Sequence, residues 1–531
     1  MAVSKGNMHY YIRYWKNGIE STGSDKYKSL SEMQGEKATM VKTAGQAGRI
    51  MILASTFFLV AVDAAPSPQE SGQENSEVTS SIKVHVVDNP FVEKGFIHIM
   101  GPSPAILPGQ EGTWDDWILE SSDIFKDGHT YYWYYHARGA GKNRPRKGYQ
   151  VGVATAPGPL GPWTRYEGNP ILGCGPDGSW DSEWVACGCV MKETVGKRRP
   201  AKDTYYLWYS GGGPEGTHIG LATSSSPLGP WRKYERNPVL KTFGYLGSVV
   251  KVGGKFFLFS EHPVGSSSPD QGPMSIAIAD HPAGPWVKYE RNPILTPGDW
   301  GAWDDGGYSE ASVRYSDGIF HWFYSGTKAT KLESIGYAYS LDGFRWTKYP
   351  GNPILPLNRV PDASGFAEVK ALIEPPFVYL YHTLRYISEF KDEKGQWVTE
   401  HLAIQVLSTT PKFRIPFPIL QVASLGPRKE TTWRDCRPVS LENASSCALT
   451  VRYRHGPQVM AGLSLHVRSS SDGISYDTTD LLTFDIEAGP GEIVGKTMNI
   501  VSGVRFFKVI CQSLEESAEI SNLEVTATVG N

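Results

Sequence analysis

Three common features are scarce or missing in this sequence. The 52 basic and 55 acidic residues nearly balance, for a formal net charge of −3, so no basic stripe is available for a nucleic acid. The main apolar run, residues 50–62, is shorter than the about 20 residues of a membrane-spanning helix. The six cysteines form two groups of three, which leaves at least one thiol unpaired in each group, and their spacing is not that of a zinc site. Because the positive and negative charges nearly balance, a neutral ligand is the expected partner.

Glycine, proline and aromatic residues are abundant instead. The chain has 57 Gly, 37 Pro and 12% aromatic residues, which suit tight turns and packed sheet faces. This composition predicts an all-β protein.

One phrase is written four times along the chain. The pattern Gly-Pro-Trp-x-x-Tyr-x-x-Asn-Pro-Ile-Leu, or a close variant, occupies residues 161–172, 229–240, 284–295 and 344–355. Degenerate copies of its ending lie at residues 104–107 and 418–420, so six leucines divide the region into five units of about 60 residues. Recurrence at this period indicates a repeat fold, and five such units predict a five-bladed β-propeller.

Each unit repeats the same order of segments. An apolar segment is followed by an aromatic one, then by a segment of small and β-branched residues, and the Trp-containing phrase closes the unit. The aromatic segments are residues 131–135, 205–209, 256–259, 320–324 and 377–381. Aromatic and β-branched runs between turn residues indicate strands. We therefore predict four strands per blade.

The two ends of the chain differ from this repeat. Residues 1–65 form an N-terminal extension that ends in a signal-peptide-like segment near residues 40–65. Cleavage near Ala64 or Ala65 predicts a secreted or periplasmic protein without a membrane span, and an uncleaved anchor is the alternative. The start codon is open between Met1, Met40 and Met51. Residues 66–81 have the composition of a disordered linker. The propeller is expected over residues 82–423.

After about residue 424 the Trp-containing phrase stops and short alternating strands begin, for example at residues 461–467 and 520–529. This pattern predicts a β-sandwich over residues 424–531. A carbohydrate-binding accessory role and a structural cap are both compatible with it.

Together these motifs resemble the five-bladed propeller glycosidases, the superfamily of arabinanases, β-xylosidases and invertases and of related galactosidase and mannoside phosphorylase branches. The resemblance covers residues 85–425 and rests on the five repeats, the aromatic second strands and three Trp-Asp openings. These openings are Trp114-Asp115, Trp180-Asp181 and Trp303-Asp304. It implies that no cofactor is required, although such proteins often have a central Ca²⁺ or halide; no local motif specifies one here.

The resemblance places carboxylates on the innermost strands, where glycoside cleavage needs one protonated and one ionised carboxyl group about 5 to 10 Å apart. In the arabinanase type, a base lies about ten residues before the paired tyrosines. Counting back from Tyr131 gives Ser121, so the sequence departs from the pattern here. Glu120 and Asp123 flank this position, and we predict Glu120 as a catalytic acid and Asp123 as a substrate-binding residue.

The same count selects two glutamates in the last two blades. Glu310 lies ten residues before Phe320, and Glu368 lies ten before Val378. Burial beside a like charge raises the pKa of one carboxyl group toward that of a general acid. Glu310 and Glu368 are therefore the predicted catalytic pair, with a structural hydrogen-bonding role as the alternative for each.

The residues at the ends of the second strands differ from unit to unit, whereas the rest of the repeat is nearly constant. Polar residues at these ends suit a sugar site lined with hydrogen-bond donors. The predicted substrate-binding residues there are His136, Arg138, Glu261, His262, His382 and Arg385. A solvated loop histidine is the alternative for the histidines. Arg138, with Arg144, Arg146 and Lys147, could meet a phosphate, a uronate or a sulfated sugar.

The aspartates of the Trp-Asp openings recur too regularly to be catalytic and are interpreted as turn-capping residues. Asp305 is the exception that we predict to bind substrate, because a second aspartate follows only in blades one and four. The fourth-strand tryptophans are expected to pack between blades. They are Trp163, Trp231, Trp286 and Trp346.

Three functions fit these patterns. The first is a secreted glycoside hydrolase acting on a polysaccharide or oligosaccharide through carboxylate acid/base catalysis. The alternatives are a phosphorylase or transglycosylase on the same scaffold and a non-catalytic, carbohydrate-binding propeller, since a fold does not fix a function.

Overall fold

The computed structural model describes most of the chain from residue 89 onward and only short strands before it. It leaves out residues 140–147, 196–201, 262–271, 310–311, 329–331, 358–362, 392–396, 433–434, 442, 456–460, 472–475, 488, 490, 492 and 501–502. Residues 1–95, with 317–319, form one compact unit, and the remainder forms a second. Within the described part, no helix has the length and apolar character needed to cross a membrane.

The first unit contains short strands and one helix. Strand β1 (Trp15–Lys16) pairs with β2 (Ile19–Glu20). Strands β3 (Ile52–Leu53), β4 (Leu59–Asp63) and β5 (Lys83–Val87) form an antiparallel sheet. Helix α3 (Pro90–Lys94) begins after Asn89, whose side chain accepts a hydrogen bond from the Phe91 amide at 3.1 Å, as an N-cap residue does.

The predicted start of the propeller at residue 82 is wrong, because β5 pairs with β4 of the first unit and not with a blade. The predicted linker, residues 66–81, and the alternative start codons lie outside the described residues. In the signal-like segment, only β3 and β4 are described.

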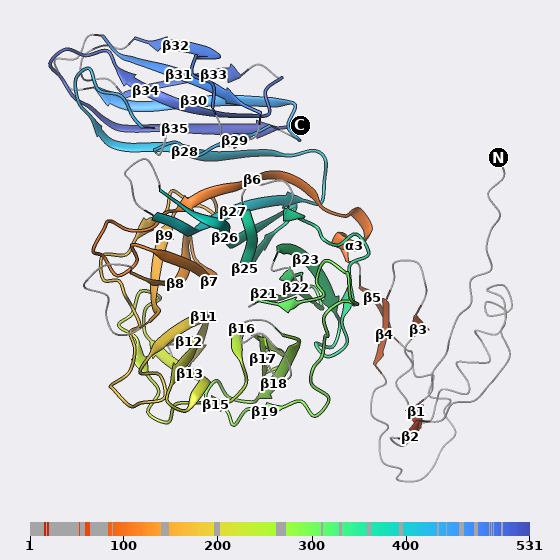
Figure 1. The fold of residues 1–531 in the computed structure, drawn as a ribbon. Coiled ribbons are helices and arrows are strands. Elements are labelled where there is room, and N and C mark those ends of the chain that lie inside the picture. Colours follow the sequence, from red (N-terminus) through yellow and green to blue (C-terminus); the bar gives the residue numbers. More distant parts are fainter. Residues whose placement is uncertain are drawn as a thin grey trace, which may run out of the picture. The chain divides into compact units, whose positions relative to one another are not determined.

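The second unit begins with a ring of antiparallel sheets (Figure 1). Blade one contains β7 (Ile118–Asp127), β8 (Thr130–Arg138), β9 (Gln150–Ala156) and β10 (Thr164–Arg165). Blade two contains β11 (Trp184–Val195), β12 (Lys202–Gly213), β13 (Gly216–Ser224) and β14 (Arg232–Lys233), and β15 (Leu240–Lys241) also pairs with β13. Blade three contains β16 (Tyr245–Val252), β17 (Lys255–Glu261), β18 (Met274–Ala279) and β19 (Val287–Lys288).

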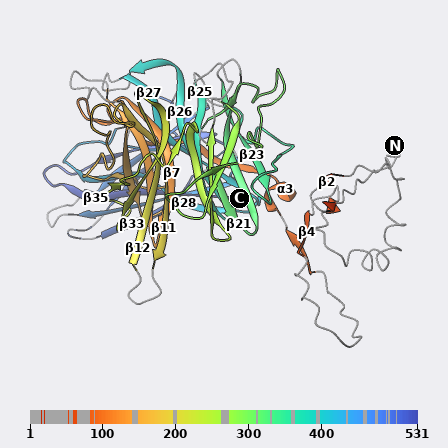
Figure 2. The same ribbon diagram turned by 90° about the horizontal axis from the view of Figure 1, so that it is seen from below.

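Blade four contains β20 (Gly307–Tyr308), β21 (Ser312–Ser316), β22 (Ile319–Thr327), β23 (Glu333–Ser340) and β24 (Thr347–Lys348). The predicted order of segments is thus confirmed in these four blades. Strands β7, β11, β16, β21 and β25 lie nearest the centre of the ring in Figure 1, and Figure 2 shows the long strands β7, β11 and β12 lengthwise.

Blade five draws its strands from both ends of the propeller sequence. Strands β25 (Ala363–Glu374), β26 (Phe377–Lys391) and β27 (Trp397–Ser408) are consecutive, and the fourth strand is β6 (Ile97–Ile106). The register pairs Leu402 with Ile106 and Ser408 with Ile97. The ring is therefore closed by hydrogen bonds between its first and last strands.

A polar frame explains why the repeat is so regular, and blade two shows it clearly. Trp180 stacks on Tyr209 at 5.6 Å between ring centroids. One carboxylate oxygen of Asp181 accepts hydrogen bonds from the Tyr209 hydroxyl at 3.1 Å and from Lys233 at 2.5 Å. The Asn237 amide donates to the same hydroxyl at 3.2 Å. Asp181 therefore has a structural role, as predicted, but it joins strands of the blade through these contacts.

Equivalent contacts recur in blades one and four: Arg165 to Asp115, Asn169 to Tyr135, Lys348 to Asp304 and Asn352 to Tyr324. The fourth-strand tryptophans pack between blades, as expected. Trp163 contacts Trp133 of its own blade and Tyr381 of blade five, at 5.4 and 5.9 Å.

The C-terminal part consists of two four-stranded antiparallel sheets, as the sequence predicted. One sheet is ordered β28 (Arg414–Leu425), β35 (Ile520–Gly530), β30 (Ser446–His455) and β33 (Ile493–Ile500). The other is ordered β29 (Val439–Ser440), β34 (Phe506–Ser513), β31 (Leu463–Ser470) and β32 (Leu482–Ile486). Buried residues of both sheets form one cluster, for example Val451 and Val525 with Leu465 and Val509, which makes the part a β-sandwich. All six cysteines are free thiols.

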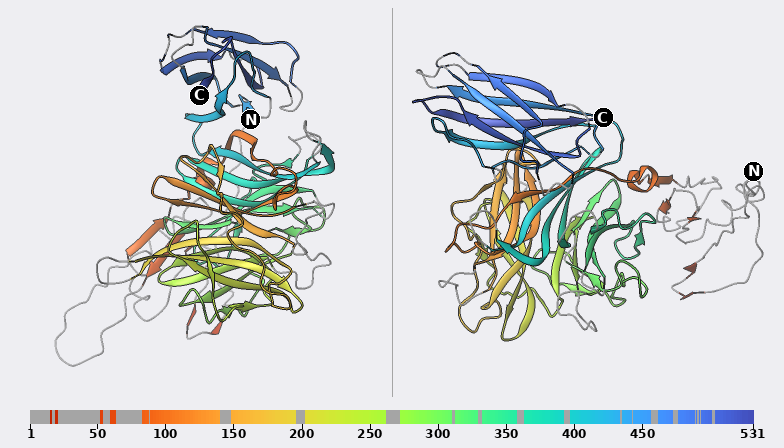
Figure 3. Two further views of the ribbon diagram at one scale, coloured as in Figure 1. Left: turned by 90° about the vertical axis from the view of Figure 1, so that its left-hand side faces the viewer. Right: turned by 45° about the horizontal axis from the view of Figure 1, so that its top comes forward.

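The predicted boundary at residues 423 and 424 is wrong, because it falls inside β28. This strand pairs with β35 of the sandwich, so the sequence at residues 418–420 is not the end of a fifth blade. The sandwich lies beside β6 and β27 of blade five (Figures 1 and 3). Arg437 of the sandwich donates a hydrogen bond to the Leu160 carbonyl oxygen of blade one, and the cores of the two parts are continuous.

Candidate active site

The innermost strands share a local irregularity that aims side chains into the centre of the ring. The pairing register shifts between Ser121 and Asp123 in β7, and equivalent shifts occur in β11, β16 and β25. A β-bulge re-aims a side chain in this way. At the shift in β25, Glu368 has a φ of +47°, a conformation that costs a non-glycine residue of order 1–3 kcal/mol and persists where the surroundings fix it.

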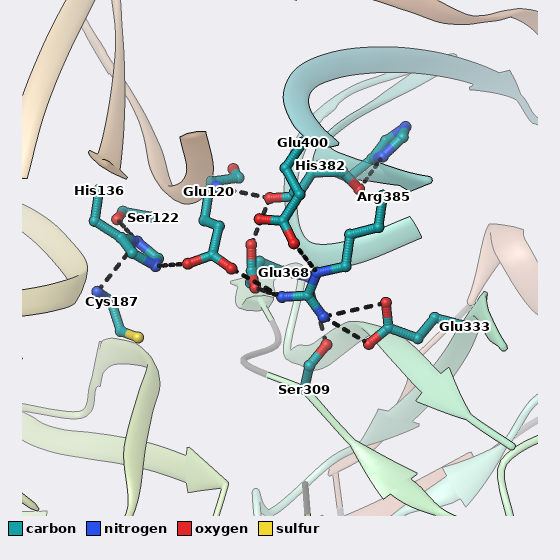
Figure 4. A network of polar contacts seen from close by, with 12 residues as sticks. Glu120, Ser122, His136, Cys187, Ser309, Glu333, Glu368, His382, Arg385 and Glu400 are labelled. Carbon is teal, nitrogen blue, oxygen red and sulfur yellow. Dashed lines mark hydrogen bonds and ion pairs between the residues drawn. The ribbon is translucent and has the colours of Figure 1, made fainter. Parts of the chain in front are cut away.

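Four carboxylates converge on one guanidinium at this level of the ring (Figure 4). Arg385 on β26 donates from Nη1 to Glu333 at 3.1 Å and from Nη2 to Glu120 at 3.0 Å, and its Nε lies 3.2 Å from a Glu400 oxygen as an ion pair. Its Nη2 also contacts Glu368. Gly365 on the adjacent strand permits this arrangement, since a Cβ there would lie 2.0 Å from a Glu333 oxygen. We call these five residues the Arg385 cluster.

Besides Arg385, Glu120 contacts His136 on the adjacent strand. The distance from His136 Nε2 to a Glu120 oxygen is 2.9 Å, and Ser122 lies 2.9 Å from the other ring nitrogen. Burial opposes the ionisation of Glu120, but the hydrogen bond and charge of His136 and the charge of Arg385 hold the pKa of Glu120 well below its usual range. Glu120 is therefore a carboxylate.

Glu400 shows the opposite behaviour. Burial and the negative charge of Glu120 raise the pKa of Glu400 to about 8, although Arg385 opposes the rise. The Oε2 atom of Glu400 is buried and has no hydrogen-bond partner in the described part of the chain, and a protonated Glu400 can donate a hydrogen bond to Glu120. The raised pKa keeps the proton on Glu400 at neutral pH.

The members of the cluster differ in access to solvent. The side chains of Arg385 and Glu400 are 25% and 18% exposed, whereas those of Glu368 and Glu333 are 4% and 3% exposed. The protonated carboxyl group is therefore the one of the four that a ligand entering the ring reaches most easily.

Three predicted site residues, Glu120, Glu368 and Arg385, meet in this cluster, and a fourth, His136, contacts it through Glu120. Both oxygens of Glu368 are engaged, one by Arg385 and the other by the Thr383 hydroxyl. Thr383 in turn accepts a hydrogen bond from the Ser121 amide at 2.9 Å, which links blade five to blade one. Glu310 and His262 lie outside the described residues, so their assignment stays a prediction.

Asp123, predicted to bind substrate, instead joins three inner strands. Its carboxylate accepts hydrogen bonds from Arg314 of β21 at 2.6 Å and from the Val190 amide of β11 at 2.8 Å. The residue is 2% exposed. Its position after the bulge turns it away from Glu120 and into the packed part of the channel, so its role is structural.

Asp305 and His382 also have structural surroundings. Asp305 accepts a hydrogen bond from the Gly301 amide at 2.8 Å, and Asp116 accepts one from Gly112 in blade one, so the second aspartate caps a repeated turn. His382 is fully buried beside Phe366 and Gln405, and burial lowers its pKa to about 4. It precedes Thr383 on β26, and strand alternation places it on the opposite face from the cluster.

Arg138 and Glu261 lie at the ends of second strands, as predicted. Arg138 ends β8 and lies over the rings of Trp117 and Tyr149. Glu261 ends β17 and is fully buried. Substrate binding by both residues stays a prediction.

Glu333 and Glu400 were not predicted from the sequence. Both stand near the start of a third strand, β23 and β27. Glu333 pairs with Thr327 in blade four, where no second-strand end was selected. The register pairs Glu400 with Arg385. Inspection of the residues that face each selected second-strand end would have found Glu400.

The residues of the cluster do not fit a central Ca²⁺. Calcium takes six to eight oxygen ligands around an open centre, whereas these carboxylates already surround the Arg385 guanidinium. Across the residues that the structure describes, no group of three or more His, Cys, Asp or Glu has a metal-binding arrangement. No chemical step is therefore assigned to a metal.

No family model matches the sequence, and no curated protein matches it. Among solved structures, the chain is similar to Zg3597, a family 117 glycoside hydrolase of Zobellia galactanivorans, with 14% identity over 59% of this chain and 89% of that chain and a TM-score of 0.40. It is also similar to a Bombyx mori family 32 β-fructofuranosidase, with 11% identity over 80% and 93% of the two chains and a TM-score of 0.41.

A third similar structure represents the GH130 family of mannoside phosphorylases, which contains glycoside hydrolases that target β-1,2 mannosidic linkages in Candida mannan. It has 16% identity over 58% of this chain and 93% of that chain and a TM-score of 0.42. These proteins are of the kind that the sequence motifs resemble. The fold assignment itself rests on the strand order, namely five blades closed by β6 and followed by a β-sandwich.

Proposed function

We propose that this protein is a glycoside hydrolase in which Glu400 donates the proton. One observation carries the proposal: the Arg385 cluster gathers four carboxyl groups around one guanidinium near the centre of a propeller, where burial and the charge of Glu120 raise the pKa of Glu400. An environment that raises the pKa of one carboxyl group above those of its neighbours supplies the general acid of a glycosidase.

Glu400 has the properties that a general acid needs. Its pKa of about 8 keeps it protonated at neutral pH, and it is more exposed than Glu368 or Glu333. In the proposed step, the Glu400 proton passes to the glycosidic oxygen as the bond from that oxygen to the anomeric carbon breaks. Glu120 then has the role of a positioning residue, because its charge keeps the proton on Glu400.

Glu120 is too close to Glu400 to be the second catalytic carboxylate, since the two share a hydrogen bond and the catalytic groups stand about 5 to 9.5 Å apart. Glu368 is the better candidate. It contacts the same guanidinium as Glu400, and Arg385 and Thr383 each donate a hydrogen bond to one of its two oxygens. Glu368 would attack the anomeric carbon or take a proton from the attacking water.

The substrate class is a polysaccharide or an oligosaccharide, and the signal-like segment makes secretion part of the same proposal. The N-terminal sequence of the protein recovered outside the cell would test secretion. Extracellular protein that begins near residue 65 would support secretion, and retention of all the protein inside the cell with residues 1–64 intact would contradict it.

The test of the activity is a screen of wild type, Glu400→Gln and Glu368→Gln on arabinan, xylan, fructan, agar-type and mannan oligosaccharides. Glu374→Gln is the matched control, because Glu374 lies on β25 with Glu368 but pairs with Lys126 outside the cluster. The proposal expects product release that both cluster variants lose and the control keeps.

The design also separates the alternatives. Turnover that depends on added phosphate would indicate a phosphorylase. Sugar binding without turnover in any of these proteins would indicate a carbohydrate-binding propeller and would end the assignment of Glu400 as an acid.

A further inference from the structure

Arg138 is a cation close to the Arg385 cluster that no described carboxylate neutralises. It follows His136 by two residues on β8, so both side chains lie on the same face of the strand. Its guanidinium lies 4.7 Å from the centre of the Trp117 ring and 5.2 Å from that of Tyr149. Two aromatic rings therefore hold the charge in place.

The absence of a counter-ion among the described residues distinguishes Arg138 from other cations of the propeller. Arg385, Arg314 and Lys192 all pair with carboxylates. Arg138 has no ion pair with any described residue, and its Nε atom is buried there without a hydrogen-bond acceptor. An arginine presents five donors in a fixed fork that matches carboxylate and sulfate oxygens. One of them, the Nε donor of Arg138, has no acceptor among the described residues.

Tyr149 links this arginine to the cluster. Its ring centroid lies 5.1 Å from that of His136 and 5.2 Å from the Arg138 guanidinium, so His136 and the guanidinium are at most about 10 Å apart. His136 contacts Glu120 directly. A sugar bound over the cluster would therefore extend toward Arg138 within one or two residues.

Among the described residues, the Arg385 cluster offers no free cation to an anionic sugar, whereas Arg138 does. Glu120, Glu333, Glu368 and Glu400 all contact Arg385, so its guanidinium is already surrounded by carboxyl groups. A sugar with a negative group therefore gains nothing from the cluster itself. A separate, preorganised cation is the means by which such a group would be bound.

We propose that Arg138, held by Trp117 and Tyr149, forms a subsite for an anionic substituent of the sugar substrate, either a uronate carboxylate or a sulfate. This subsite rests on the proposed glycosidase function and names its substrate class. Arg138 binds the substituent and takes no part in proton transfer.

The test compares wild type, Arg138→Gln and Arg138→Lys on matched oligosaccharides that differ only in the charged group. One pair is a uronide and its neutral sugar, and the other is a sulfated and an unsulfated sugar. Arg345→Gln is the control for net charge, since Arg345 is exposed after β23 in blade four.

The expected result is a preference of the wild type for one charged substrate that Arg138→Gln reduces by about 10- to 100-fold in kcat/KM, mainly through KM. Arg138→Lys recovers part of it, and the neutral partner is unaffected. An equal loss on charged and neutral sugars, or a wild type that prefers neutral sugars, overturns the subsite while leaving the hydrolase intact.

Calorimetric binding to Glu400→Gln, with and without Arg138→Gln, tests the subsite if no turnover is found. Selective loss of binding to a charged oligosaccharide in the double variant supports the subsite even though the hydrolase proposal has failed. Equal binding of all sugars by both proteins overturns it.

Discussion

At the scale of single residues, the decisive feature is that Glu120 and Glu400 differ in charge although they are neighbours. Glu120 is stabilised as an anion by His136 and Arg385, and its charge then disfavours ionisation of Glu400. A like-charge pair in a desolvated site divides its protons in this way. The positions of the cationic neighbours, and not the residue type, decide which glutamate is the acid.

This division predicts the pH dependence of activity. The kcat/KM of the wild type should fall as pH rises through about 8, because Glu400 loses the proton it must donate. Glu120→Gln removes the charge that raises this pKa, so the alkaline limb should move to lower pH. A pH–rate profile of both proteins measures the pH of this limb. A limb that stays in place or moves to higher pH in Glu120→Gln would contradict the assignment of Glu400 as the general acid.

The free energy of unfolding should also depend on pH through Glu400. The pKa of Glu400 is raised in the folded state from an ordinary value of 4.5 to about 8, so the folded protein binds the extra proton between these two values. This contribution is fully present below pH 4.5 and is lost as pH rises through 8. Glu400→Gln should therefore be more stable relative to wild type at pH 8.5 than at pH 5 by urea denaturation, and a constant difference would argue against it.

At the scale of the blade, repeated polar contacts fix each strand against the next. The Trp-Asp opening, the second-strand tyrosine and the basic residue of the fourth strand meet in blades one, two and four. This frame positions the inner strands, whose bulges aim Glu368 and its neighbours at the centre. The chemistry of the site thus depends on contacts far from it.

Gly220→Ala tests this frame. A Cβ at Gly220 would lie 2.8 Å from the Trp180 ring and 2.7 Å from the Tyr209 ring, and stiff rings move only at a cost of about 1–3 kcal/mol in the free energy of unfolding. Gly158→Ala is the control, since its nearest atom would lie 3.7 Å away. Chemical denaturation should show a loss for the first variant alone, and equal stability of the two would refute the argument.

At the scale of the whole molecule, β6 closes the ring by pairing with β27, almost 300 residues later in the sequence. This closure places Arg385 and Glu400 of blade five beside Glu120 and His136 of blade one. The candidate site therefore exists only when the ring is complete.

Two truncations test the closure. Removal of residues 1–95 should leave a folded propeller, because β6 begins at Ile97. Removal of residues 1–106 should abolish cooperative unfolding, since β27 loses its partner and blade five an edge strand. Calorimetry of both truncated proteins measures whether each unfolds in a cooperative transition. Similar transitions in the two proteins would show that β6 is dispensable.

The sequence by itself determined the features that recur locally. The Trp-containing phrase gave the blade length, the aromatic runs gave the second strands, and variation at their ends found His136 and Arg385. These succeed because strand patterns and turn residues act over a few neighbours. The sequence count also selected Glu368, which the structure places in the cluster.

Only the tertiary structure decided the features that depend on pairing between distant segments. Residues 418–420 match the repeat but belong to β28, because a strand joins the sheet that offers it a partner and not the sheet its motif resembles. Glu333 lies 52 residues from Arg385, and Glu120 lies 265 residues from it. No local pattern brings these charges together, and their proximity sets which carboxyl group keeps its proton.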